Sequence, residues 1–158
     1  MGMTLAVLTF IHLLGLGLWV GGIVALLVLI TLAARAAEQG RNEAVRSLSH
    51  AAFVLNWVIM VGGALTVVSG VIQTFGASTP LLDRTAMPLF LMQLLGFVAF
   101  TGSGFLYRAT AVAAHKGDEL ALGKTNYLAF LAANGRAGWV GFFVLICLLG
   151  ALVTASLT

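Results

Sequence analysis

The chain has 158 residues, of which 61% are hydrophobic and only 8% are charged. A soluble domain carries about 25% charged residues, so this chain has too few to cover a water-facing surface. Its net charge of +3 does not indicate nucleic-acid binding, because the basic residues lie in short connections and form no patch or motif. The composition predicts a single-domain integral membrane protein in contact with the lipid bilayer and without a nucleic-acid partner.

Four apolar runs are each close to the roughly 20 residues that cross a bilayer core. Backbone groups in lipid must be hydrogen-bonded within their own segment, so each run is predicted to be an α-helix. The predicted spans are residues 5–34, 51–75, 87–107 and 137–156, with cytoplasmic loops at 35–50 and 108–136. The predicted fold class is all-α, an integral membrane four-helix bundle of up-down-up-down topology. The second loop is expected to be partly helical, with a break at Asn134-Gly135.

Lysine and arginine predict the orientation of the bundle. Seven of the eight basic residues lie in the first and third connections, and only Arg84 lies in the second. Since basic residues are enriched in cytoplasmic loops, both termini are expected on the outer side. A bacterial inner (cytoplasmic) membrane is the expected location.

Small residues recur at helical spacing, which lets membrane helices approach closely. Gly17 and Gly21 form a GxxxG pair, and Gly62, Thr66 and Gly70 make a second stripe. Such faces predict packing within the bundle. They also predict association with other membrane subunits or with further copies of the chain.

The first span contains one ionisable residue, His12, and a histidine at membrane depth is a candidate functional site. His12, Gly15, Trp19 and Gly22 lie on one helix face by the i, i+3, i+4 and i+7 rule. A glycine below an imidazole leaves room for a flat ring, which suits haem. The same arrangement also suits a hydrogen bond to a neighbouring helix. Gly15, Trp19 and Gly22 are therefore predicted cofactor contacts, and His12 a predicted ligand.

Depth limits the partners of His12, which lies about 10–12 Å below the outer end of its helix. Three side chains are predicted at this level: Met92, Gln93 and Cys147. Methionine and cysteine are soft ligands that suit Cu(I), and methionine is also a second axial ligand of haem. The predicted cofactor is therefore haem b or copper, or none. Without a metal, Gln93 is the expected hydrogen-bond partner.

The other two histidines, His50 and His115, lie at the cytoplasmic ends of helices, about a bilayer thickness away. A haem ligated by His12 and either of them is excluded by this topology. They are expected to approach each other, to bind haem propionates with Arg46 and Arg108, or to remain solvated at the headgroup level. A further polar residue, Asn56, lies inside the second span and is predicted to bond to another helix.

The opening stretch Ile11-His12-Leu-Leu-Gly15 and Leu18-Trp19-Val-Gly21-Gly22 resembles the copper-resistance protein D (CopD) superfamily. It also resembles a related family of integral membrane proteins of unknown function, in which a similar helix precedes an Arg/Ala-rich loop. Leu32-Ala-Ala-Arg-Ala-Ala37 and the pair Ser69-Gly70 extend the likeness over about the first half of the chain. The resemblance implies a polytopic membrane protein tied to copper or haem, with His12 as the only transferable ligand. The chain is also more distantly similar to the four-helix protoporphyrinogen oxidase HemJ. It lacks that family's further span histidine and its lysine.

Two function classes remain open. In the first, the protein holds a redox metal near the outer face through His12, with Met92 or Cys147 as a second ligand. In the second, it is a cofactor-free accessory subunit that packs against a larger membrane complex. An enzyme is not the expected class, because the chain has no phosphate loop, Ser–His–Asp set or CxxC motif. A third possibility, that the protein is an enzyme of haem synthesis, is supported only by His12.

Overall fold

The structure, a computed structural model, describes residues 2–76 and 86–156. The described chain is all-α and forms four helices. Their bounds are α1 Gly2–Glu38, α2 Asn42–Gly76, α3 Ala86–Ala121 and α4 Tyr127–Ala155. All four are long and apolar enough to cross a membrane. The chain is therefore a polytopic four-helix membrane protein, as its composition predicts.

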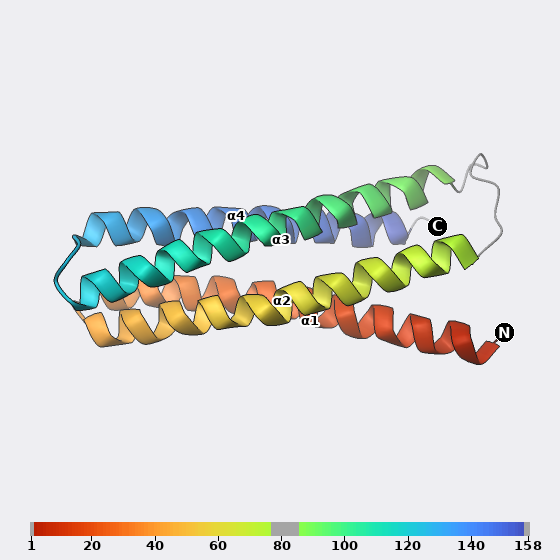
Figure 1. Ribbon diagram of the computed structural model, residues 1–158. Helices are drawn as coiled ribbons and strands as arrows, with labels where there is room; N and C mark the ends of the chain where they lie inside the picture. Colours follow the sequence, from red (N-terminus) through yellow and green to blue (C-terminus); the bar gives the residue numbers. More distant parts are fainter. Residues whose placement is uncertain (1, 77–85, 157–158) are drawn as a thin grey trace.

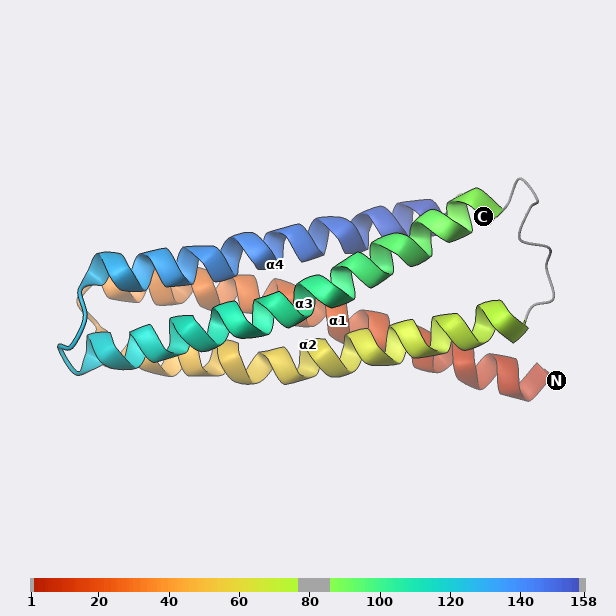
Figure 2. The same cartoon turned by 45° about the horizontal axis from the view of Figure 1, so that its top comes forward.

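The helices run antiparallel to their neighbours in an up-down-up-down bundle (Figure 1). The two hairpins, α1 with α2 and α3 with α4, pack most extensively, and α2 contacts α3 more than α1 contacts α4. α1 begins and α4 ends at the same end of the bundle, and both short turns lie at the opposite end. Figure 2 shows the same arrangement from a second direction, with the two hairpins diverging toward the end that carries the termini.

Both short turns end a helix with a glycine in the left-handed region, where a side chain would be strained. Gly40 and Gly123 each have φ +66°. After α1, the Arg41 amide donates to the Ala36 carbonyl at 2.9 Å, and after α3, the Lys124 amide donates to the Glu119 carbonyl. These bonds satisfy carbonyls that the helix end would leave open, so each chain reversal takes only a few residues.

The helices extend well beyond the predicted spans. Segments 35–50 and 108–136, predicted as loops, are helical except at residues 39–41 and 122–126. Hydropathy detects only the part of a helix that lies in lipid, whereas these ends are stabilised by packing on one another. A second core cluster covers them, made of Ala33, Ala36, Ala37, Val45 and Phe130.

The break predicted at Asn134-Gly135 does not occur, and α4 continues through it. The buried Asn134 side chain donates to the Ile30 carbonyl of α1 at 2.9 Å. This bond satisfies an amide that would otherwise be unpaired in an apolar interior, so the helix has no reason to end there.

α2 and α3 meet along a stripe of small and polar residues that recurs every seven positions. Asn56, fully buried, donates to the Thr110 hydroxyl of α3 at 2.6 Å, which confirms its predicted bond to another helix. One heptad away on each helix, Ser49 lies so close to Gly117 that a Cβ there would be 3.1 Å from the Ser49 Oγ. A seven-residue period is the signature of helices that cross at a shallow left-handed angle.

α1 and α2 approach most closely where glycine faces glycine. A Cβ added to Gly15 would lie 2.8 Å from the Gly62 carbonyl oxygen and 2.8 Å from the Thr66 amide. A Cβ at Gly22 would lie 2.7 Å from the Ile59 side chain. In contrast, a Cβ added to Gly17 or to Gly21 would have no atom of another helix within 4 Å. The face that holds the hairpin together is therefore Gly15 and Gly22, and the GxxxG pair faces outward.

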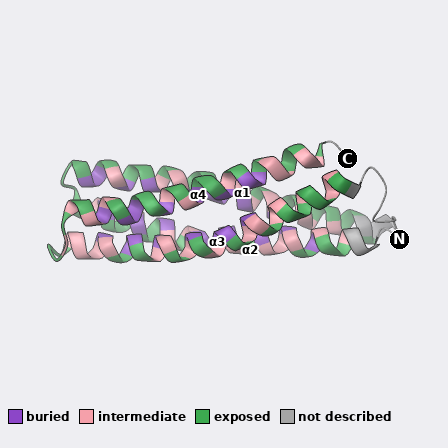
Figure 3. Cartoon of the chain, turned by 90° about the horizontal axis from the view of Figure 1, so that it is seen from above, coloured by how far each residue is buried: buried purple, intermediate pink, exposed green. Residues whose placement is uncertain are grey.

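The tightly packed core stops partway along the bundle (Figure 3). Among the residues of α1 whose burial is described, the last buried one toward the N-terminus is Gly15, and on α4 the last toward the C-terminus is Leu148. Among the described residues of α3, none before Ala99 is buried. The end of the bundle that carries the termini is therefore more loosely packed than the rest.

The contact between α1 and α2 predicts opposite effects for two matched substitutions. Gly15→Ala places a methyl group against backbone atoms that cannot move aside, so it should destabilise the fold by about 1–3 kcal/mol. Gly17→Ala carries the same gain in helix propensity, about 1 kcal/mol, but meets no atom. Unfolding in mixed micelles, followed by circular dichroism, would measure both. Equal stability of the two variants would contradict the contact.

Candidate functional site

The loosely packed end of the bundle contains a cavity of about 460 Å³ that is lined by all four helices. This volume falls within the roughly 300–1,000 Å³ of small-molecule sites. The floor is formed by Trp19 and Leu148, the last large side chains of the packed core. Around its edge lie residues that are also exposed on the outer surface, Leu13, Val71, Phe97 and Leu152. The cavity is therefore apolar and reaches the lipid-facing surface.

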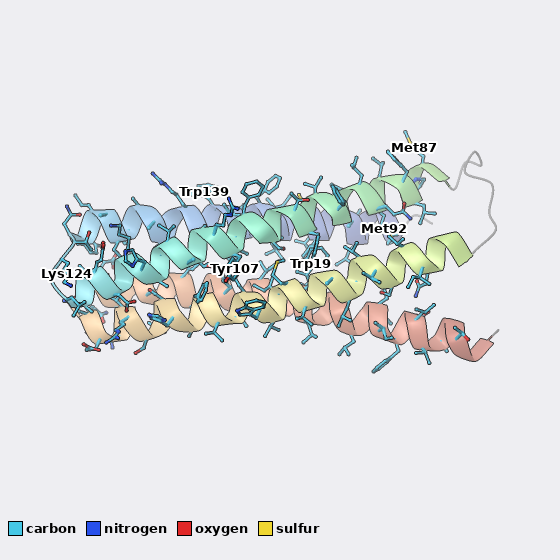
Figure 4. The ribbon with its side chains drawn as sticks, viewed as in Figure 1. Trp19, Met87, Met92, Tyr107, Lys124 and Trp139 are labelled. Atoms are coloured by element: carbon cyan, nitrogen blue, oxygen red, sulfur yellow. The ribbon has the colours of Figure 1, made fainter. Side chains whose placement is uncertain are left out.

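Three of the predicted residues meet on this cavity. His12 and Trp19 line it from α1, and Met92 lines it from α3. Gln93 also lines it, so the predicted layer of neighbours around His12 is right for α3. Figure 4 labels Trp19 near the middle of the bundle and Met92 nearer the end that carries the termini.

The His12 ring lies against α2, where it has space because position 70 is a glycine. A Cβ at Gly70 would lie 3.1 Å from Cε1 of the ring. His12 Nδ1 forms a hydrogen bond of 3.2 Å with the Ser69 Oγ. The hydrogen bond of His12 that the structure shows is therefore to Ser69 on α2.

The hydrogen bond with the Ser69 hydroxyl affects the tautomer of His12, that is, which ring nitrogen carries the proton. Ser69 donates to a carbonyl oxygen of its own helix, Leu65 at 2.5 Å, with the Thr66 carbonyl at 3.2 Å. A hydroxyl has a single proton, and these carbonyls can only accept. With its proton on the Leu65 carbonyl, the closest of these contacts, the Ser69 Oγ accepts from His12, an arrangement that favours the tautomer with Nδ1 protonated. In the neutral ring, Nε2 then carries the lone pair and is the nitrogen able to bind a metal.

The cavity floor is held rigid by a second cross-helix bond. Trp19, with none of its surface exposed, donates from Nε1 to the Ser103 Oγ of α3 at 3.0 Å. Its ring also packs edge-on against Phe100, with ring centroids 6.2 Å apart. A buried indole N–H without a partner would be costly, so this bond fixes α1 and α3 relative to each other below the cavity.

Gly15 and Gly22, predicted as cofactor contacts, lie elsewhere. Both are packed against α2, and neither lines the cavity. The space that a glycine at position 15 leaves open is filled by Gly62 and Thr66. Their predicted role in cofactor binding has no geometric support here.

Cys147, predicted as a possible metal ligand, is buried in the apolar core cluster. It does not line the cavity, because the part of α4 at the level of His12 is one to two turns further along, at residues 151–155. Within residues 2–76 and 86–156, no group of three or more His, Cys, Asp and Glu side chains is arranged to hold a metal ion. A metal at this site would have to be held by fewer than three side chains of these four types.

The two other histidines lie at the opposite end of the bundle, in ion pairs. His50 and Arg46 of α2 both contact the Asp118 carboxylate of α3, at 3.0 Å each. His115 pairs with Glu119 one turn along its own helix, at 3.2 Å. The contacts of Asp118 join α2 to α3 beyond the apolar region. His12 is therefore the histidine of the cavity.

Sequence reasoning did not single out Ser69 as the partner of His12. The available signal was its place on the small-residue face of α2, next to Gly70. The position of Ser69 on that face does not show which turn of α1 packs against it, because this depends on how closely the two helices approach each other. Comparisons with protein-family models, curated proteins and solved structures found no match for this chain.

The tautomer of His12 is directly measurable. With histidine labelled by ¹⁵N, at a pH where the imidazole is neutral, the His12 signal should show Nδ1 protonated and Nε2 unprotonated, assigned by its loss in His12→Gln. Ser69→Ala removes the acceptor and should shift the signal toward the other tautomer. Thr101→Ala removes an exposed hydroxyl bonded to its own helix and should have no effect. A wild-type signal with Nε2 protonated would contradict the assignment.

Proposed function

We propose that the protein holds haem b in the intramembrane cavity, with His12 Nε2 as the iron ligand. The observation that carries the proposal is the Ser69 hydrogen bond, which favours the tautomer with the lone pair on Nε2. Metal-binding histidines characteristically donate their other N–H to an acceptor that fixes the ring. The cavity offers apolar walls of the kind a porphyrin requires, and the bound group would supply one-electron redox chemistry.

Haem is favoured over copper by the donors available. A Cu(I) site needs several soft donors that converge on one ion. Of the soft side chains predicted as ligands, Met92 lines the cavity and Cys147 does not. Haem iron already has four ring nitrogens and requires only axial ligands from the protein. His12 supplies one such ligand, and Met92 is the candidate for the second.

The residues around His12 have distinct parts in this proposal. Ser69 orients the imidazole, and Gly70 gives its ring room to lie along α2. Trp19 closes the cavity toward the packed core. Leu13 and Phe97, both largely exposed, lie where a hydrophobic ligand would enter from the bilayer.

The visible spectrum tests this proposal. Wild-type protein in mild detergent, purified and then offered haem, should show a Soret band that His12→Ala lacks. Ser69→Ala should weaken haem binding by about 10–100-fold, the usual effect of removing a partner that orients a ligand. His115→Ala, which removes an exposed histidine at the other end of the bundle, should leave the spectrum unchanged. Identical spectra of wild type and His12→Ala would contradict the proposal.

A cofactor-free accessory subunit is the second candidate, favoured by one specific observation. Gly17 and Gly21 form a GxxxG pair that the bundle does not use and that faces outward. Such a pair is typical of a helix that packs closely against another membrane helix. A wild type that takes up neither haem nor copper, but purifies with a membrane partner in fixed ratio, would favour this candidate.

We further propose that both termini lie on the outer side of a bacterial cytoplasmic membrane. The turns at 39–41 and 122–126 lie at one end of the bundle together with most of the basic residues, which are enriched on the cytoplasmic side. The opposing residue, Arg84, lies outside the described residues.

Cysteine labelling tests this orientation in a Cys147→Ala background. An impermeant maleimide added to cells with a permeabilised outer envelope should label Ser156→Cys. It should label Gln39→Cys only after the cytoplasmic membrane is disrupted. The reverse pattern would contradict the proposed orientation.

A further inference from the structure

A second open groove of about 590 Å³ lies at the opposite end of the bundle from the His12 cavity, over the turn between α1 and α2. Its walls are mainly apolar and come from both helices. Two arginines, one on each side of the turn, complete it. The lining residues are Leu32, Arg35, Gln39, Arg41, Ala44, Ser47 and Leu48.

The two arginines have no acidic partner in the described part of the chain. Arg46 of the same hairpin is paired with Asp118, and Lys116 with Glu119, but no ion pair involves Arg35 or Arg41. The nearest acidic residues in the sequence are Glu38 and Glu43, and neither lines this groove; Glu38 lines a separate groove on another side of the turn. The groove is therefore bordered by two arginines and by no acidic side chain.

The groove lies at the depth of lipid headgroups. Arg35 is 23 residues from His12 along α1, which is about 35 Å of helix. A bilayer core is about 30 Å thick, so a helix with His12 at one boundary of the core places Arg35 about 5 Å beyond the other boundary, among the headgroups. Leu32, 41% exposed, lies one turn deeper and faces outward into lipid. The groove thus runs from the apolar region to the headgroup region.

We propose that this groove binds one anionic phospholipid, with its phosphate between Arg35 and Arg41 and an acyl chain along Leu32 and Leu48. Paired guanidinium groups recognise phosphate through charge-assisted hydrogen bonds, and the Ser47 hydroxyl offers a further donor. The apolar walls favour a lipid over a free phosphate ion, which would leave Leu32, Ala44 and Leu48 uncovered. This lipid site requires neither a ligand in the His12 cavity nor a particular orientation of the turn in the membrane.

Native mass spectrometry of purified protein with phosphatidylglycerol and with phosphatidylcholine tests the proposal. Wild type should retain one phosphatidylglycerol in preference to phosphatidylcholine. Arg35→Gln/Arg41→Gln should bind it about 30-fold more weakly, since each arginine near a membrane surface contributes about 1 kcal/mol. Ala44→Trp, which fills the groove and keeps both charges, should also lose the retained lipid.

Lys124→Gln/Arg136→Gln is the matched control, because it removes the same net charge from the same end of the bundle. It should retain the lipid as wild type does. Equal loss in this control would show a diffuse charge effect and overturn the proposal. Equal retention in Arg35→Gln/Arg41→Gln would also overturn it. Displacement of the lipid by millimolar inorganic phosphate would identify a free-anion site instead, and would likewise overturn it.

Discussion

The close approach of α1 and α2 at Gly15 and Gly62 is the contact on which the rest of the structure depends. With no side chain at either position, the two backbones pack directly against each other, the main source of packing energy between helices in lipid. This contact sets the register of the hairpin. One turn further along, the same register brings His12 against Gly70 and next to Ser69. The environment of the cavity histidine is thus a consequence of a backbone contact one turn below it.

The kind of contact between the helices differs along the length of the bundle. In the middle, Trp19 bonds to Ser103 and Asn56 to Thr110, so polar groups inside an apolar core are paired across helices. Toward the termini, buried positions end and the helices enclose a cavity with one imidazole. At the opposite end, the contacts of Asp118 with Arg46 and His50 are added to a second apolar cluster. A tightly packed middle section therefore separates the His12 cavity from the groove at the turn between α1 and α2.

Much of this architecture follows from local properties of the sequence. Four apolar runs predict four helices, and short connections predict antiparallel neighbours. The cross-helix bond of Asn56 was predictable because an amide in lipid must find a partner. The level of Met92 and Gln93 relative to His12 was predictable from helical rise alone. The level of Cys147 was not, because α4 begins ten residues before its predicted span and the helices are not in simple alignment. The helical ends that lie beyond the membrane were missed because hydropathy does not measure how Ala36 or Phe130 packs on other helices.

The sequence by itself determined that this is a four-helix membrane protein with a single histidine in the N-terminal half of its first predicted span. Those properties depend on the apolarity and length of each segment, which act locally. Only the tertiary structure decided what surrounds that histidine. Ser69 is 57 residues away along the chain, and which turn of one helix faces which turn of another depends on how closely their backbones approach. The Ser69 hydroxyl, 2.5 Å from the Leu65 carbonyl oxygen, then favours the tautomer of His12 that leaves Nε2 available for chemistry.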